Sequence, residues 1–360
     1  MARVLYGVHG TGRGHAIRAL VVARHYSSHE FLFVSHGEGA RMLREQFQVL
    51  DCPNPITQVD AHRVQFLPTV LRTGAVLTEG RRWRREVRHA AGRFSPDVAI
   101  TDYEFFVPRV ARALGLPCLS LDNQHALTEG RPDFPSGQLL SSLGTSLSVR
   151  LLFSSADQYL ISCFFDVSPR DADPLVRWAP SLVRDEVTSL RTHQGDHVVA
   201  YQGYATFPRF IDALGALGRP VHLYGQGSGP SRGSLSFEDF REQAFLEDLA
   251  TCAYVVCGGG HTLISEALHL GKPVLSIPVT GMFEQFLNAH YLERCGYGSR
   301  SSIGSFSIHT LRDFERRLDA CRDRIRAHDF CGNQAVFAAV DDFIAGRWRR
   351  PQGLGLPPAT

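Results

Sequence analysis

Three consecutive glycines and the two polar residues after them have the types and spacing to bind a phosphate group: Gly258, Gly259, Gly260, His261 and Thr262. The apolar run at residues 253–257 is typical of a buried strand, and the pattern after the glycines is typical of a helix that ends near Gly271. Backbone N–H groups at a helix N-terminus are unpaired, and together with the helix dipole they favour a bound anion. The segment therefore predicts a diphosphate site that needs no metal ion, to which Thr262 can add a hydroxyl.

Acidic residues after the glycines could bind the other parts of a nucleotide sugar. Glu266 lies one helical turn after Thr262, so the two side chains share a face of the expected helix. Its two oxygens can accept hydrogen bonds from both hydroxyls of a ribose, although the helix dipole alone also favours a glutamate there. Glu284 and Gln285 begin another helix after the apolar run at residues 274–277. An acid and an amide can bind several sugar hydroxyls, although such a pair often only caps its helix.

A second glycine loop follows the apolar run at residues 3–8 and consists of Gly10, Thr11, Gly12, Arg13, Gly14 and His15. A dinucleotide-binding fingerprint would need glycine where His15 stands, and a P-loop would need a Gly-Lys-Ser/Thr ending, so both are excluded. Gly12 and Gly14 still allow a ligand to approach the backbone closely at a helix N-terminus. An imidazole can accept a proton near neutral pH, so His15 either deprotonates an acceptor hydroxyl or only caps its helix.

Two other residues are alternatives to His15 as the catalytic base. Asp102 follows the apolar run at residues 97–101 and should face the edge where parallel strands end, although an aspartate there often caps the next turn. His125 ends the polar segment at residues 121–125.

These residues must be positioned by short apolar strands that alternate with helical patterns. The expected strands are residues 3–8, 31–35, 97–101, 118–121 and 159–162 in the first half, and 197–201, 221–224, 253–257 and 274–277 in the second. Continuous apolar strands separated by helices indicate parallel sheets covered on both faces. We expect an α/β chain with two doubly wound, Rossmann-like domains facing across a cleft, where such folds place ligands.

The chain of 360 residues is long enough for two hydrophobic cores. We expect an acceptor-side domain at residues 1–165, a linker rich in Pro, Arg and Asp at 166–195, a nucleotide-sugar domain at 196–346, and a poorly ordered tail at 347–360.

Composition excludes several classes of function. Lys and Arg total 38 against 36 Asp and Glu, which argues against nucleic-acid binding. The eight cysteines are scattered without a C-x-x-C pair, the N-terminus lacks a secretion-signal pattern, and no apolar run approaches the about 18 residues of a membrane span. We expect a cytoplasmic protein whose contact with a membrane is at most peripheral. The basic segment at residues 81–89 could rest on anionic lipid, or it could be a solvated helix that covers the sheet.

The region at residues 252–297 resembles the donor domain of GT-B glycosyltransferases, in the branch of the peptidoglycan lipid II N-acetylglucosaminyltransferase and similar bacterial and archaeal proteins. The resemblance implies that the glycine run binds the diphosphate, that Glu266 binds the ribose, and that Glu284 and Gln285 bind the donor sugar. Residues 245–248 have a spacing similar to the loop whose backbone reads the base, which implicates Phe245. The first glycine loop is also similar to the N-terminal glycine loop of that enzyme, but Arg13 departs from its sequence Gly-Gly-Thr-Gly-Gly-His. The resemblance therefore does not imply that this chain uses the acceptor of the peptidoglycan enzyme.

The resemblance further implies that a hexose or N-acetylhexosamine is transferred with inversion from a nucleoside-diphosphate sugar to an acceptor hydroxyl. It also favours UDP as the nucleotide of the donor. No metal and no cofactor beyond this co-substrate are implied. The acceptor is left open; a glycolipid or polyprenyl-linked sugar at the inner face of the membrane is one candidate. In agreement with inversion, no two glutamates between Glu186 and Glu315 lie eight positions apart, as they do in many retaining GT-B enzymes. A non-hydrolysing UDP-sugar epimerase and a non-catalytic nucleotide-sugar-binding protein are the alternatives.

Overall fold

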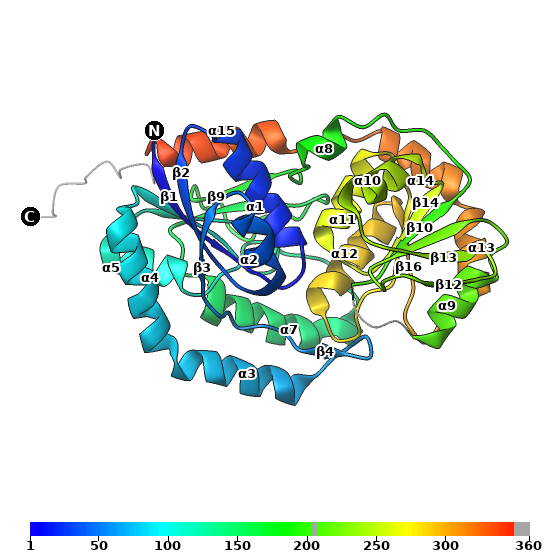
Figure 1. Cartoon of the computed structure of the whole chain (residues 1–360), viewed down its shortest axis with the longest axis horizontal. Coiled ribbons are helices and arrows are strands. Elements are labelled where there is room, and N and C mark those ends of the chain that lie inside the picture. Colours follow the sequence, from blue (N-terminus) through cyan, green and yellow to red (C-terminus); the bar gives the residue numbers. More distant parts are fainter. Residues whose placement is uncertain (204–206, 349–360) are drawn as a thin grey trace, which may run out of the picture.

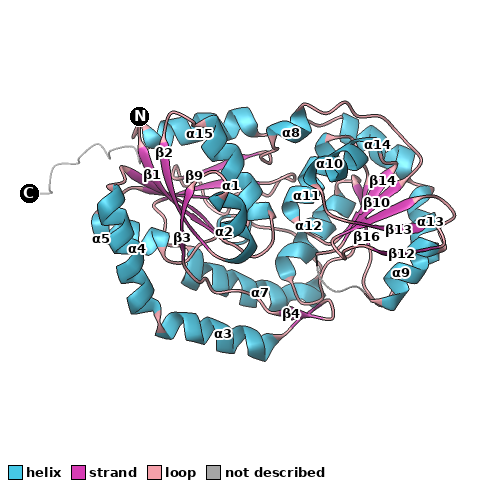
Figure 2. Ribbon diagram, viewed as in Figure 1, coloured by secondary structure: helices cyan, strands magenta, loops and turns pink. Residues whose placement is uncertain are grey.

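Two α/β domains lie side by side in the computed structural model, which describes residues 1–203 and 207–348 (Figures 1 and 2). The first domain contains a seven-stranded sheet in the order β3-β2-β1-β6-β7-β8-β9, with every pairing parallel. Its strands are β1 (Arg3–Val8), β2 (Glu30–Ser35), β3 (Gln48–Asp51), β6 (Val98–Asp102), β7 (Cys118–Asp122), β8 (Gln158–Ser162) and β9 (Val176–Ala179). Its helices are α1 (Gly14–His25), α2 (Gly37–Arg44), α3 (Phe66–Thr78), α4 (Gly80–Phe94), α5 (Val107–Leu114), α6 (Ala126–Glu129) and α7 (Leu139–Ser148), and a π-helical turn (Val149–Phe153) follows α7.

The second domain repeats this design with the strand order β12-β13-β11-β10-β14-β15-β16, in which only the β12–β13 pairing is antiparallel among the described strands. Its strands are β10 (Val198–Tyr201), β11 (Val221–Tyr224), β12 (Gly229–Arg232), β13 (Leu235–Glu238), β14 (Tyr254–Cys257), β15 (Val274–Ser276) and β16 (Gly298–Arg300). Its helices are α9 (Pro208–Gly215), α10 (Glu242–Thr251), α11 (His261–His269), α12 (Phe283–Arg294), α13 (Ile308–Glu315) and α14 (Leu318–Arg326). The predicted pair of doubly wound domains is confirmed.

The strand order brings the predicted site segments together. In the first sheet the strand order changes direction at β1, which lies between β2 and β6. In the second sheet it changes direction at β10, which lies between β11 and β14. Ligands of doubly wound folds bind at these switch points, beyond the carboxyl ends of the strands. The first glycine loop follows β1, and the three glycines follow β14.

The predicted domain boundaries are wrong in two places. β9 falls inside the expected linker at 166–195 but pairs with β8 as the last strand of the first sheet; the linker proper contains α8 (Asp185–Thr188). α15 (Asn333–Ile344) falls inside the expected second domain but packs on the first, where Val336 and Val340 join the core around β1. The sequence shows the apolar face of this helix, but not which core covers it.

The predicted tail also begins too early. The Trp348 side chain is buried, and its Nε1 donates a hydrogen bond to the Pro174 carbonyl at 2.9 Å. The rest of the expected tail, residues 349–360, lies outside the described residues.

A short hairpin of the first domain reaches the second domain. It consists of β4 (Val59–Asp60) and β5 (Arg63–Val64), and Ala61 and His62 at its tip have φ of 45° and 59°. The Val64 amide donates to the Thr280 carbonyl at 2.9 Å, and the Thr280 amide donates to the His62 carbonyl at 3.1 Å. The hairpin therefore supports the loop between β15 and α12, just before Glu284.

All eight cysteines are free thiols, and six of them are buried. Among the described residues, no helix has the length and apolar character needed to span a membrane.

Candidate active site

Residues predicted from both domains meet where the two sets of strands end. The Thr262 hydroxyl, in the first turn of α11, donates to the Gly14 carbonyl of the first glycine loop at 3.3 Å. The side-chain amides of Asn123 and Gln124, which follow β7, donate to Glu284 Oε1 at 3.1 and 3.0 Å. The segments predicted for the donor and acceptor sides are thus in direct contact.

His15 is held by a buried carboxylate. Its Nδ1 lies 2.7 Å from Asp102 Oδ1, and the His15 side chain is 15% exposed whereas that of Asp102 is fully buried. Arg18 Nη2 also lies 3.2 Å from His15 Nδ1. In the tautomer that carries its proton on Nδ1 and donates it to Asp102, Nε2 can accept a proton from another group. A base that is oriented by a carboxylate is the arrangement used in general base catalysis.

Arg18 balances the charge of Asp102. Its Nε and Nη2 each donate to an oxygen of Asp102 at 2.7 Å, and its Nη1 donates to Asn123 Oδ1 at 3.2 Å. Burial alone would lower the pKa of Arg18, but the charge of Asp102 and the hydrogen bonds to it raise this pKa. Sequence reasoning missed Arg18; its signal was an arginine among Ile17, Leu20 and Val21, on the apolar face of α1.

His125 is enclosed, unlike His15. It is 1% exposed, its Nδ1 lies 2.7 Å from Asp122 Oδ2, and its Nε2 lies 3.1 Å from Ser154 Oγ. Because both ring nitrogens have partners inside the protein, His125 links the loop after β7 to the segment before β8. Of the three candidate bases, only His15 has both a carboxylate partner and a partly exposed side chain, because His125 and Asp102 are buried.

Tyr103, a further residue that the sequence did not reveal, lies beside His15 and stacks on Phe153 at 3.8 Å between ring centroids. Its φ of 53° is unusual for a residue other than glycine, and such strain gathers at functional sites. Its ring is parallel to that of His15 at 6.2 Å between centroids, and Asn54 Nδ2 donates to its carbonyl at 3.1 Å.

The three glycines join β14 to α11 as predicted. A Cβ at Gly259 would lie 2.4 Å from the Gln285 carbonyl oxygen, so only glycine fits there. Gly260 is the N-cap residue, and within the described residues no side chain caps α11. The amides at the start of α11 are therefore available to an anion. His261 can contribute its amide, whereas its ring is buried against Phe164.

Glu266 is paired with an arginine of the interdomain linker. Arg184 Nε and Nη2 donate to the two oxygens of Glu266 at 2.6 and 2.8 Å, and Glu266 is 1% exposed. Arg184 Nη1 also donates to Glu242 Oε1 at 2.5 Å, and Glu242 accepts from Arg13 Nη2 at 3.0 Å. Both oxygens expected to bind a ribose therefore already have a partner, which the sequence did not indicate.

The prediction that Phe245 belongs to a loop is wrong. Phe245 lies inside α10, its side chain is 3% exposed, and its amide donates to the Arg241 carbonyl at 2.9 Å. An amide inside a helix cannot read a base, because it is already paired. The loop ends at Arg241, and Phe240 in that loop packs beneath the Arg13 guanidinium at 4.5 Å.

Gln285 supports the loops around it. Its Oε1 accepts from the Val279 amide at 3.0 Å and from the Gly259 amide at 3.4 Å. The neighbouring Glu284 is held by the first domain, so the acid and the amide have separate partners.

A family model described as glycosyl transferase family 1 matches residues 2–319. The chain belongs to this family. An uncharacterised glycosyltransferase of Methanosarcina acetivorans is 26% identical to this glycosyltransferase over 337 residues, which cover 84% of this chain and 86% of the relative. A UDP-N-acetylglucosamine–N-acetylmuramyl-(pentapeptide) pyrophosphoryl-undecaprenol N-acetylglucosamine transferase of Bacillus cereus is 27% identical over 134 residues, covering 34% of this chain and 37% of that protein.

Solved structures show the same fold. The structure of Phytolacca americana UGT2 complexed with UDP-2-fluoro-glucose and pterostilbene has a TM-score of 0.67 and 14% identity, and the match covers 94% of this chain and 98% of that one. The glycosyltransferase therefore has the predicted GT-B fold, with two facing doubly wound domains.

Proposed function

We propose that this glycosyltransferase transfers a hexose or N-acetylhexosamine from a UDP-sugar to an acceptor hydroxyl, with inversion and without a metal ion. The observation that carries the proposal is the placement of the His15–Asp102 pair beside the uncapped start of α11. The hydrogen bond from Thr262 to Gly14 joins the start of α11 to the loop that contains His15. The candidate base and the candidate anion site thus lie on segments of the two domains that are joined by a hydrogen bond.

The reaction is a single displacement. The acceptor hydroxyl gives its proton to His15 Nε2, and its oxygen forms a bond with the anomeric carbon. The bond from that carbon to the diphosphate oxygen breaks, and the diphosphate keeps the electron pair. Amides at Gly260, His261 and Thr262 stabilise the added charge, which is the task that a metal ion would otherwise perform. One displacement from the opposite face inverts the anomeric carbon.

The donor is oriented by the acidic residues of the second domain. Glu266 lies one turn from the α11 N-terminus, and it can accept from ribose hydroxyls when Arg184 gives up part of its pairing with it. Glu284 lies between the domains, where its carboxylate can exchange the Asn123 and Gln124 amides for sugar hydroxyls. UDP is favoured over other nucleotides by the resemblance to the lipid II branch.

Donor binding and product analysis test the proposal. Thermal melting with a panel of nucleotides should show stabilisation by UDP and UDP-sugars, since a ligand of the native state stabilises it by RT ln(1 + [L]/Kd). The replacement E266Q should weaken UDP. Incubation with the UDP-sugar alone should leave the sugar unchanged, whereas an epimerase would interconvert it and a binding protein would yield no product with any acceptor.

We further propose that the acceptor is lipid-linked, because nearly all exposed large apolar side chains of the described residues lie on two helices of the first domain and the turn that follows one of them. Apart from Met1, every exposed large apolar side chain of the described residues lies on α3, on α7 or in the turn after α7. They are Phe66, Leu67, Val70, Leu71, Leu77, Leu139, Leu140, Leu143, Leu147 and Leu151. Both helices run along the lower margin of the first domain in Figure 1. Exposed apolar side chains gathered on two helices in this way are typical of a protein or membrane contact.

Basic residues near this apolar surface suit an anionic membrane. α4 follows α3 directly, and it buries Val87 and Ala91 while Arg81, Arg82 and Arg85 are exposed. Sedimentation with liposomes tests the contact: L140S with L143S should reduce binding to both neutral and anionic liposomes, whereas R82S with R85S should reduce only the anionic component. If the wild-type protein sediments with neither liposome, the membrane contact is refuted and the sugar-transfer proposal is not affected.

A further inference from the structure

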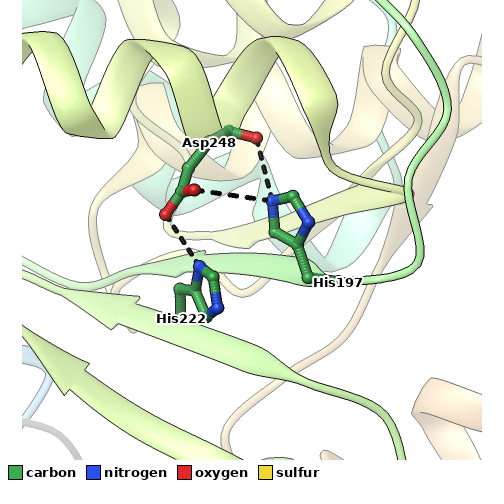
Figure 3. Close-up of side chains that lie close together, drawn as sticks. All are labelled: His197, His222 and Asp248. Carbon is green, nitrogen blue, oxygen red and sulfur yellow. Dashed lines mark hydrogen bonds and ion pairs between the residues drawn. The ribbon is translucent and has the colours of Figure 1, made fainter.

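Two histidines and an aspartate of the second domain lie close together (Figure 3). His197 immediately precedes β10, His222 is the second residue of β11, and Asp248 lies near the end of α10. Because His197 and His222 lie at the beginnings of their strands, the cluster is at the opposite edge of the sheet from the proposed donor site. Its role is therefore separate from sugar transfer.

The three side chains present their ligand atoms to one point. One nitrogen of each histidine and one carboxylate oxygen all lie within 4.8 Å of one another. His222 Nδ1 is 2.7 Å from Asp248 Oδ2, and His197 Nε2 is 3.8 Å from Asp248 Oδ1. The two imidazole rings stack at 4.8 Å between centroids with 21° between their planes, and Figure 3 shows one nitrogen of each ring directed toward Asp248.

These separations suit a tetrahedral ion. Ligand atoms about 2.0–2.1 Å from a tetrahedral Zn²⁺ lie about 3.3 Å apart. The observed separations, 2.7 Å to Asp248 Oδ2 and 3.8 Å to Asp248 Oδ1, lie on either side of that value, and the side chains must shift before all three bind one ion. His197 Nε2 also lies 3.1 Å from the Asp248 carbonyl, and the ion would replace this contact.

The surroundings of the cluster also fit an ion site. The Tyr224 hydroxyl donates to Asp248 Oδ2 at 2.5 Å, and a hydrogen bond of this kind orients a ligating carboxylate. The side chains of His197, His222 and Asp248 are 16%, 30% and 25% exposed, so an ion and its water can reach them. The positions are fixed by two paired parallel strands and one helix.

We propose that His197, His222 and Asp248 bind one divalent transition-metal ion, with Zn²⁺ the best match, and that water completes its coordination. Imidazole and carboxylate ligands in a set of three with an open position are typical of Zn²⁺ and related ions. The ion ties α10 to β10 and β11. Since α10 begins at Glu242, which pairs with Arg184 and Arg13, the ion stabilises the helix that carries the interdomain ion pairs.

Metal titration of the chelator-treated full-length protein tests this site. One equivalent of Zn²⁺ should raise the melting temperature, and Co²⁺ should give the visible spectrum of a nitrogen- and oxygen-ligated tetrahedral site without a thiolate charge-transfer band. The spectrum is decisive because the chain contains eight free cysteines that could also bind these ions.

Variants assign the ligands. H197A and H222A should each lose the Co²⁺ spectrum and the Zn²⁺-dependent stabilisation, and Y224F should weaken Zn²⁺ binding by about 10-fold or more. H309A is the matched control, because His309 is an exposed histidine on α13 of the same domain. Melting of each variant in chelator shows whether it folds. The proposal is overturned if wild type binds no ion, if Co²⁺ shows thiolate bands, or if folded H197A and H222A bind Zn²⁺ as tightly as H309A.

Discussion

Replacement of His15 by alanine should separate catalysis from stability. In the proposed mechanism His15 Nε2 takes the acceptor proton, so H15A removes the base. Loss of a general base costs about 10²- to 10⁴-fold in rate, or roughly 3–5 kcal/mol of transition-state stabilisation. We expect kcat to fall by that factor, while the Kd for UDP changes little because the donor binds through α11.

The structure limits what H15A does to folding. His15 contributes one hydrogen bond to Asp102, and Arg18 keeps both of its own, so no buried charge loses its partner. The free energy of unfolding should fall by only about 1 kcal/mol. D102N provides the contrast: it leaves the Arg18 charge buried without a counter-ion, which costs about 3–5 kcal/mol.

The assay compares H15A, H125A and wild type by single-turnover transfer from a UDP-sugar and by thermal melting. H125A should lower the melting temperature, because His125 is 1% exposed and bonded through both ring nitrogens. The reasoning is refuted if H15A turns over as fast as wild type, or if H125A keeps its wild-type melting temperature and loses all activity.

Three further substitutions test the same structure. G259A would place a Cβ 2.4 Å from the Gln285 carbonyl oxygen, so the free energy of unfolding from denaturant melts should fall by about 1–3 kcal/mol. R184M leaves the buried Glu266 unpaired, so the free energy of unfolding in the same melts should fall by about 3–5 kcal/mol. If ribose hydroxyls replace the guanidinium, UDP should stabilise R184M by more than it stabilises wild type. Burial raises the pKa of Glu104 from 4.5 to about 7, so its folded form retains a proton that the unfolded chain has released. Stability from this group is therefore greatest below pH 4.5 and falls as the pH rises to about 7, and stability curves of E104Q should lack this slope.

The central strands could be predicted from sequence because they are buried on both faces and consist of apolar runs. β6 and β7 are wholly buried, and both were expected within one residue of their observed bounds. The edge strands could not be predicted in this way. β3 is half-exposed and β12 is fully exposed, so their residues need not be apolar. Strand pairing at an edge depends on the neighbouring strand, which a local pattern does not contain.

The same limit applies to the candidate site. The glycines, His15 and Glu266 stand out because local rules link their types to strand ends and helix starts. No local rule singles out Arg18 or Arg184, although Arg18 pairs with Asp102 and Arg184 pairs with Glu266. Arg184 lies 82 positions before Glu266, so only the tertiary structure pairs them. Local sequence can thus predict which acids gather at a cleft, but not which cations compensate them.

This compensation bears on how the cleft binds a donor. Asp102 is neutralised by Arg18, and Glu266 and Glu242 are neutralised by Arg184 and Arg13. With these charges balanced in pairs, Asp102, Glu242 and Glu266 repel an incoming diphosphate only weakly, whereas Glu284 is held by the Asn123 and Gln124 side-chain amides. In the proposed mechanism the attraction comes from the uncapped amides and dipole of α11, the one helix start among the site segments that follows three glycines.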